Sequence, residues 1–329
     1  MTQADLDVLG IGNAIVDVLA HCEDAFLESE GLVKGSMNLI EVAQSDGLYE
    51  RMGPGVEVSG GAAANSMAGI ASFGGRAAYI GKIRDDQLGG VFAHDIRAAG
   101  VHFDTPVAPD GPPTARSLIL VTPDAHRTMS TYLGAAVELG PEDVDTDLVA
   151  RCSVTYLEGY LWDKPRAKDA FRVAMAAARA AGRRVSLTLS DSFCVERHRD
   201  EFNALVDDQV DILFANREEI LSLTQTRDLR EAVAAVRGRS ELVVVTLSER
   251  GSMVVTAEDT VEVPAAPVER LVDTTGAGDL YAAGFLHGFT TARPLAECAA
   301  LGSLAAAEVI SHLGARPQTD LAALAAAAV

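Results

Sequence analysis

The sequence has few cysteines, a shortage of positive charge and no long apolar run, and each shortage excludes a class of protein. Its 329 residues include 4 cysteines, none with C-x-x-C or C-x-x-H spacing, so neither a disulfide framework nor a zinc site is indicated. Lys and Arg total 27 against 47 Asp and Glu, for a formal net charge of −20, which argues against nucleic-acid or anionic-membrane binding. Without a membrane-spanning run or signal-peptide pattern, we expect a cytoplasmic protein.

What the sequence does contain is a glycine-rich turn at residues 273–279, DTTGAGD, between an extended segment predicted at 261–272 and a helical pattern beginning at Leu280. The first amides of a helix have no internal partner, and glycines such as Gly276 and Gly278 let an anion, most often phosphate, approach them. The Asp279 carboxylate would repel that anion, so its presence beside the turn suggests a chemical role. One such role is to accept the proton of an attacking hydroxyl. The alternative is a tight turn followed by an ordinary acidic first turn.

From Cys152 onward the pattern predicts buried strands alternating with helices, which implies a parallel sheet covered on both faces. Ligands of such sheets bind beyond the carboxyl ends of the strands. Asn13, Asn216, Thr246 and the turn at Asp273 all follow predicted strands, so one shared site is expected there.

Two common nucleotide-binding motifs are only partly matched by this sequence. Gly10 and Gly12 begin a G-x-G-x-x-G pattern, but its third glycine would fall on Ile15, and the following residues read as a strand. Residues 75–83 resemble a Walker A loop with the wrong glycine spacing, and Ile83 stands where a Ser or Thr should hold magnesium. A dehydrogenase fold and a P-loop are therefore rejected.

Polar residues early in the chain have two interpretations. Asn13 and Asp17 flank a strand end, where an aspartate can bind two vicinal hydroxyls or make ordinary turn contacts. Gly60 and Gly61 precede a helical segment containing Asn65, which fits either a flexible turn or close approach of backbone to a ligand. Strand patterns at residues 114–121 and 127–132 predict a hairpin. With the segments near residues 16 and 39, this hairpin could form a separate small sheet.

The string DTTGAGDLYAAG resembles the C-terminal signature of the ribokinase-like (PfkB-type) carbohydrate and nucleoside kinases, and GKIRDDQLG resembles their N-terminal signature. The resemblance covers the whole chain. It implies one domain, 1–329, with a three-layer α/β/α core, a mostly parallel central sheet, and a small β-sheet lid inserted at about 15–42 and 104–133.

The resemblance also implies roles for individual residues. Asp279 is the catalytic base, and the backbone of Gly276, Ala277 and Gly278 is the anion hole. Arg127, at the head of a lid strand, corresponds to an arginine that reaches the transferring phosphate. The substrate-binding residues implied are Asn13, Asp17, Gly60, Gly61, Asn65 and Leu161.

For the nucleotide and metal ions the resemblance implies a second set of residues. The ATP site comprises Asn216, Thr246, Ser248 and Gly251, although Ser248 replaces a family glycine and Asn216 equally suits a helix cap. In the N-x-x-E motif, Glu219 organises water around magnesium. Several members also bind potassium near Asp273, Thr275 and Gly314.

The expected function is an ATP-dependent kinase for the primary hydroxyl of a small molecule. GNAIVD, YLEGYLWD and VDILFANREE are most similar to adenosine kinases, which favours adenosine over ribose or fructose. Ala62 and Ala63 depart from the polar residues that adenosine kinases often carry there. The resemblance also implies that Leu161 or Trp162 packs against the base, and plain core packing is the alternative for Trp162. A sugar kinase is one alternative, and a nucleoside-binding protein without catalysis is another. Relatives are monomers or lid-to-lid dimers, so the oligomeric state stays open.

Overall fold

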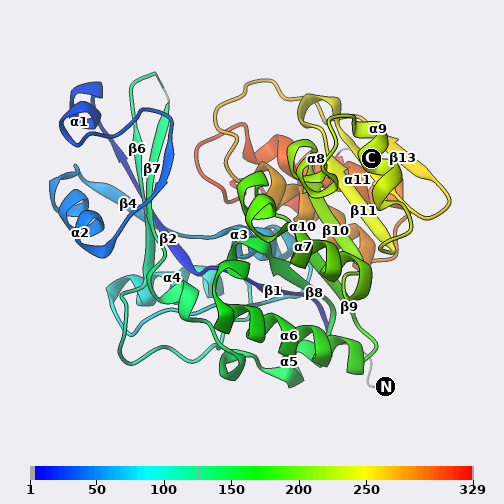
Figure 1. Ribbon diagram of the computed structural model, residues 1–329. Coiled ribbons are helices and arrows are strands. Elements are labelled where there is room, and N and C mark those ends of the chain that lie inside the picture. The colour runs from blue at the N-terminus through cyan, green and yellow to red at the C-terminus, as the bar shows by residue number, and fades with distance from the viewer. Residues whose placement is uncertain (1–3, 125, 328–329) are drawn as a thin grey trace.

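Two β-sheets organise the molecule in the computed structural model, which describes residues 4–124 and 126–327 (Figure 1). The larger, sheet A, has eight strands in the order β13-β12-β11-β10-β9-β8-β1-β5. Neighbours from β5 to β11 run parallel, and β12 and β13 are antiparallel. Its strands are β1 (Leu6–Ile11), β5 (Ala77–Ile80), β8 (Cys152–Glu158), β9 (Arg184–Thr188), β10 (Ile212–Asn216), β11 (Leu242–Thr246), β12 (Ser252–Val255) and β13 (Thr260–Val263).

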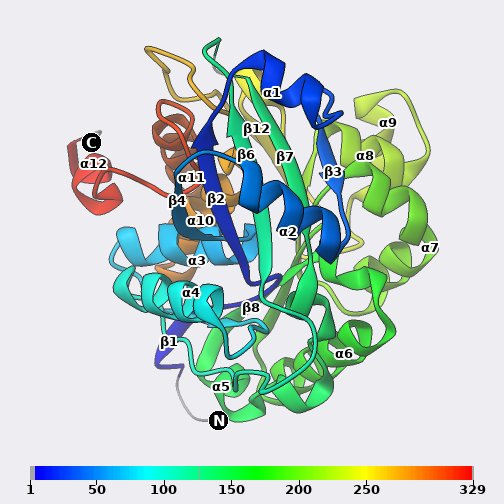
Figure 2. The ribbon, with the colours of Figure 1, turned by 90° about the vertical axis from the view of Figure 1, so that its left-hand side faces the viewer.

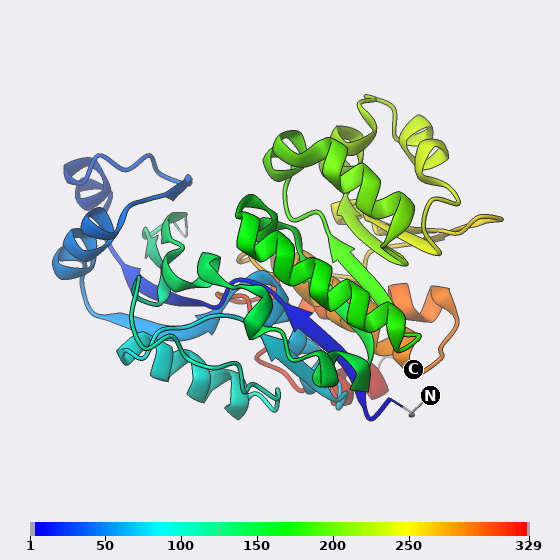
Figure 3. The ribbon, with the colours of Figure 1, turned by 60° about the horizontal axis from the view of Figure 1, so that its bottom comes forward.

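Helices cover both faces of sheet A, because successive residues of a buried strand point to opposite faces and both sets are apolar here (Figure 3). In β1, Val8 packs in one core layer and Leu9 in the other. One face carries α3 (Ala62–Ser72), α10 (Ala277–Thr290) and α11 (Leu295–Val309). The other carries α5 (Thr146–Arg151), α6 (Pro165–Ala180), α7 (Ser192–Asp208), α8 (Arg217–Thr224) and α9 (Leu229–Val236). The predicted three-layer core is confirmed.

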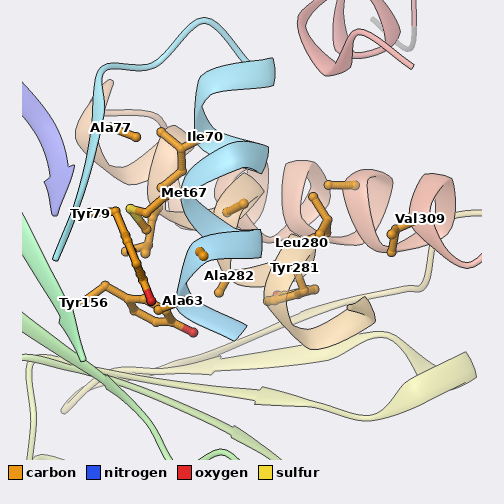
Figure 4. Close-up of a cluster of buried hydrophobic side chains, with 14 of the residues drawn as sticks. Ala63, Met67, Ile70, Ala77, Tyr79, Tyr156, Leu280, Tyr281, Ala282 and Val309 are labelled. Atoms are coloured by element: carbon orange, nitrogen blue, oxygen red, sulfur yellow. The ribbon is translucent and has the colours of Figure 1, made fainter. Parts of the chain in front are cut away.

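Helix α10 is packed tightly against α3, which matters because α10 carries the glycine-rich turn at its start. A Cβ added to Gly69 of α3 would lie 2.6 Å from the Cβ of Ala283, so glycine permits this close approach. Leu280 and Met67 are fully buried in the same cluster (Figure 4). The first turn of α10 therefore has a rigid support.

Sheet B has five strands in the order β3-β7-β6-β2-β4 and stands beside the core (Figures 1 and 2). Its strands are β2 (Ile15–His21), β3 (Met37–Leu39), β4 (Gly55–Gly60), β6 (Ala115–Val121) and β7 (Arg127–Tyr132). Helices α1 (Asp24–Ser29) and α2 (Val42–Arg51) cover its outer face (Figure 2). Four strands fall within the ranges predicted for the lid, and β4 lies outside both.

The remaining helices are α4 (Gln87–Ala98) and α12 (Leu321–Ala327). One extended segment was predicted too long: β13 ends at Val263, and residues 264–276 are irregular. Pro264 and Pro267 interrupt the pattern there, since proline cannot donate to a strand ladder. None of the helices described is both long and apolar enough to cross a bilayer.

Candidate active site

Most of the predicted substrate-binding residues and Asp279 lie together where sheet B adjoins the core. A cavity of about 460 Å³ lies there, with Asp17, Ser59, Asn65 and Arg316 among its polar residues. Its apolar wall comes mainly from sheet B and from the loop after α11. That wall includes Leu19, Val56, Val58, Val121, Leu313 and Pro317.

Asp279 lies in the first turn of α10, where Gly276 adopts a left-handed conformation (φ 80°) as the N-cap. Among the described residues, none accepts a hydrogen bond from the amides of Gly278 or Asp279, and the Ala277 amide makes one long bond of 3.3 Å to Thr274 O. These amides are the unpaired donors expected at a helix N-terminus. The predicted anion-binding turn therefore has free donors in this structure.

The Asp279 carboxylate is held by helix α3. Asn65 Nδ2 donates to Asp279 Oδ2 at 3.0 Å, and Ser66 Oγ donates to the Asp279 carbonyl at 2.9 Å. Burial raises the pKa of Asp279 to about 6, and the Asn65 hydrogen bond and the Arg316 charge oppose that shift. A carboxylate with a pKa near neutrality can accept a proton and later release it.

Asp17 of β2 is packed against the backbone of β4. A Cβ on Gly60 would lie 2.5 Å from Asp17 Oδ2, and one on Gly61 would lie 2.1 Å from the Asn13 carbonyl oxygen. Gly61 also has a φ of 95°, so both positions require glycine. Burial raises the pKa of Asp17 to about 6, and Arg127 and Arg316 lower it.

A buried glutamate, Glu158, is the first functional candidate that sequence reasoning missed. Asn13 Nδ2 donates to Glu158 Oε1 at 2.8 Å, and the Ala63 amide donates to Oε2 at 2.9 Å. Glu158 is 1% exposed, and burial raises its pKa to about 7. The available signal was a carboxylate ending a buried strand, in the YLEG segment. Glu158 thus fixes the orientation of Asn13.

Arg127 of β7 reaches the loop before α10. Its guanidinium pairs with Asp273 and donates to Thr275 Oγ1 at 2.8 Å. Asp273 also accepts from the Thr275 amide and hydroxyl at 3.0 and 2.7 Å and from the Gly314 amide at 3.0 Å. These donors lower the pKa of Asp273 against the effect of its burial. The structure therefore brings Arg127 next to the anion-binding turn.

Arg316 is the second missed candidate, and nothing in its local sequence pattern marked it. Its side chain reaches the cavity beside Asp17, and burial lowers its pKa to about 10.

The predicted nucleotide residues line a separate cavity of about 560 Å³ at the ends of β10 and β11. Asn216, Thr246 and Ser248 border it, and Gly251, with a φ of 89°, turns the chain next to it. Asn216 caps α8: its Oδ1 accepts from the Glu219 backbone amide at 2.9 Å, and the Asn216 backbone amide donates to Glu219 Oε2 at 2.9 Å. The predicted capping role is confirmed.

Glu219 is 4% exposed, and burial raises its pKa to about 7, with Asp191 adding a like charge. In the described residues no cluster of three or more His, Cys, Asp or Glu could hold a metal ion. A divalent cation here would have to be held mainly by waters and by ligand phosphates.

Leu161 was predicted to contact the base, but its side chain is 1% exposed and lies in the core with Trp162. Trp162 Nε1 donates to Glu201 Oε2 at 2.9 Å, which supports the packing interpretation of this tryptophan. In this structure Leu161 offers no surface to a ligand, because the short turn after β8 directs its side chain into the core layer formed with α6 and α7.

The chain is similar to known proteins over nearly its whole length. The family model described as pfkB family carbohydrate kinase matches residues 31–321. An adenosine kinase structure from Sinorhizobium meliloti is 58% identical, with a TM-score of 0.92 over 99% of this chain and 100% of that one. A probable sugar kinase from Rhizobium etli is 51% identical, with a TM-score of 0.92 and 99% of both chains covered. A curated cytidine kinase from Thermococcus kodakarensis is 37% identical over 141 residues, which is 41% of this chain and 50% of that protein.

Proposed function

Because the chain belongs to the pfkB family of carbohydrate kinases, we propose that it transfers the terminal phosphoryl group of ATP to the primary hydroxyl of a nucleoside, with adenosine as the first candidate. The observation that carries this proposal is the Asp279 carboxylate, held by Asn65 beside the unpaired amides of the α10 N-terminus.

In this proposal Asp279 takes the proton of the substrate hydroxyl as that oxygen attacks the phosphorus. The amides from Gly276 to Asp279 bind the migrating phosphoryl group, and Arg127 adds positive charge next to them. Donors of this kind are worth about 3–4 kcal/mol in the transition state, since they are oriented before the charge develops. Closure of sheet B over the cleft would exclude water that otherwise hydrolyses ATP.

The sugar of the substrate would be bound by Asp17, Asn13, Asn65 and the backbone of Gly60 and Gly61. The carbonyl oxygens of the Asn13 and Asn65 side chains are buried without a hydrogen-bond partner among the described residues. Buried acceptors normally have a donor. Substrate hydroxyl groups would supply those donors, and a ribose presents two vicinal ones to Asp17.

ATP would occupy the cavity bordered by Asn216, Thr246 and Ser248, with its phosphates directed to α10. Glu219 is buried with both carboxylate oxygens bonded to Asn216, so it would act on magnesium only through water, and the ion would neutralise phosphate charge when bound. For potassium, the Asp273 carboxylate is already satisfied by Arg127, Thr275 and Gly314. A potassium ion would therefore need backbone oxygens, and no step here depends on it.

The second candidate function is phosphorylation of a free sugar, and the similarity to the probable sugar kinase of Rhizobium etli favours it. The apolar wall formed by Leu19, Val56 and Val58 argues for a substrate with a group beyond the sugar. A nucleoside-binding protein without catalysis is the third, and the position of Asp279 argues against it.

The test is an ADP-release assay with magnesium and ATP against adenosine, cytidine, ribose and fructose. We expect the highest kcat/KM with adenosine, and Asp279→Ala should lose turnover while adenosine binding, measured by calorimetry, persists. Turnover restricted to ribose or fructose would contradict the nucleoside assignment. Tight adenosine binding with no ADP release by the wild-type protein would show a binding protein.

A further inference from the structure

Arg316 lies in the loop that follows α11, and this loop is held at both ends. The Gly314 amide donates to Asp273 Oδ2 at 3.0 Å. On the other side, the amides of Gln318 and Thr319 donate to Glu308 Oε1 at 2.9 and 2.8 Å. The Arg316 side chain therefore enters the cleft from a fixed point.

The guanidinium of Arg316 joins sheet B to the core. Its Nε donates to the Ser59 carbonyl at 3.1 Å, its Nη2 to Ser59 Oγ at 3.1 Å, and its Nη1 to the Ala64 carbonyl at 3.0 Å. Ser59 belongs to β4, and Ala64 lies in the first turn of α3. The Arg316 side chain thus joins Ser59 to Ala64, and the Gly60-Gly61 turn lies between these two residues. Gly60 of this turn contacts Asp17.

These three acceptors are uncharged, so the positive charge of Arg316 has no directly bonded carboxylate among the described residues. The groups that interact with it electrostatically come from four elements: Asp17, Tyr79, Asp95 and Asp279. A desolvated cation needs opposite charge nearby, and here two of the groups are the proposed substrate-binding and catalytic carboxylates. Arg316 lines the same cavity as Asp17, and it bonds Ala64, whose neighbour Asn65 holds the Asp279 carboxylate.

We propose that Arg316 is a positioning residue of the phosphotransfer site, which joins β4 to α3 and supplies the shared counter-charge of Asp17 and Asp279. This inference rests on the proposed kinase function and adds to it a residue whose hydrogen bonds go to the protein backbone and to Ser59.

The electrostatic need for this cation follows from the crowding of acids in the cleft. Burial raises the pKa of Asp17 and of Asp279, and the two charges repel each other. Asp17 also interacts electrostatically with Arg127 and Asp273. Asp279 accepts a hydrogen bond from Asn65 and interacts electrostatically with Tyr156, Glu158 and Tyr160. Without Arg316, both carboxylates would hold their protons at higher pH, and Asp279 could not accept one.

The experiment compares Arg316→Gln, which keeps polar contacts but no charge, with Arg316→Lys, which keeps the charge. Arg237→Gln is the matched control. Arg237 likewise donates to two carbonyls, Thr256 O at 2.8 Å and Asp259 O at 2.9 Å, and to one hydroxyl, but away from the cleft. For each variant, kcat/KM for the preferred substrate is measured from pH 5 to pH 8, together with Tm.

For Arg316→Gln we expect the acid limb of kcat/KM to move up by about one pH unit, since an adjacent opposite charge shifts a carboxyl pKa by roughly that much or more. Arg316→Lys should retain the wild-type limb while its Tm falls. Arg237→Gln should lower Tm and leave the limb in place. An unmoved limb in Arg316→Gln, with a Tm loss equal to that of Arg237→Gln, would reduce Arg316 to a structural bridge.

A second measurement separates this proposal from the kinase assignment. Carboxyl-carbon NMR of protein labelled in aspartate follows the Asp17 and Asp279 titrations without turnover, with signals assigned through Asp17→Asn and Asp279→Asn. Both titrations should move to higher pH in Arg316→Gln. Unchanged titrations would overturn the proposal even in an active kinase, and shifted ones would support the counter-charge even if no substrate is phosphorylated.

Discussion

Arg127 of β7 and Asp273 of the loop before α10 form a nearly buried ion pair between sheet B and the core, with side chains 8% and 4% exposed. Thr275 and Gly314 complete the network around the Asp273 carboxylate. The same loop leads into the amides of α10, so the position of sheet B is tied directly to the anion-binding turn.

The first prediction concerns this ion pair. Arg127→Gln leaves the Asp273 carboxylate buried without its cation, which should destabilise the fold by about 3–5 kcal/mol and lower kcat. Urea unfolding measures the first effect. Arg151→Gln, in the exposed pair of Arg151 with Asp5, is the control and should hardly change the unfolding midpoint. Equal midpoints for the two variants would show that burial does not strengthen the first pair.

The second prediction is a change of stability with pH at Asp279. Its folded pKa, about 6, lies above the value of 3.8 for an unperturbed aspartate, so the folded state binds the proton more tightly. Stability from this group is therefore present at low pH and lost as pH rises from about 4 to about 6. Asp279→Asn, which cannot ionise, should be more stable than wild type at pH 8, and the difference should shrink at pH 5.

The measurement is the urea midpoint of both proteins at the two pH values. Asp110→Asn, in an exposed loop, serves as the control and should show no such pH-dependent gain. The same Asp279→Asn protein should lose about 10²- to 10⁴-fold in kcat if Asp279 is the base. A stability difference independent of pH would show that the carboxylate is not strained by burial.

The third prediction separates two glycines of the turn. Gly276 has φ 80°, and a Cβ there would lie 2.8 Å from the Cβ of Ala315, whereas a Cβ on Gly278 would meet no atom within 4 Å. Gly276→Ala should therefore lower Tm. Gly278→Ala should fold as well as wild type but weaken phosphate binding, because its methyl group occupies the approach to the amides.

Thermal unfolding and the KM for ATP test this pair of variants together. Unchanged ATP kinetics in a stable Gly278→Ala protein would contradict the anion-binding role of the turn.

The fourth prediction concerns magnesium. Glu219→Gln can keep the capping box of α8, so the fold should persist. The magnesium concentration for half-maximal rate should rise about tenfold, as is common when an outer partner of a metal is changed. Glu218→Gln, at the exposed neighbouring position, is the control. An equal magnesium requirement in both variants would remove Glu219 from the proposed metal site.

Local sequence patterns predicted most of the architecture. Alternating apolar strands and helices predicted the parallel core, and the cap at Asn216 appears where the sequence placed it. The helix predicted from Leu280 begins three residues earlier, at Ala277. The strand β4 escaped notice because glycines lie at both of its ends, and it forms through pairing with β2. The placement of Leu161 also failed, since periodicity cannot tell which side of a strand end faces a ligand.

By itself, the sequence determined the fold class, the glycine-rich turn with its carboxylate, and the family, because these depend on neighbours along the chain. Only the tertiary structure decided that Glu158 holds Asn13, that Arg127 is paired with Asp273, and that Arg316 joins Ser59 to Ala64. Each of these contacts joins residues more than a hundred positions apart, and local sequence propensities do not encode contacts over such separations.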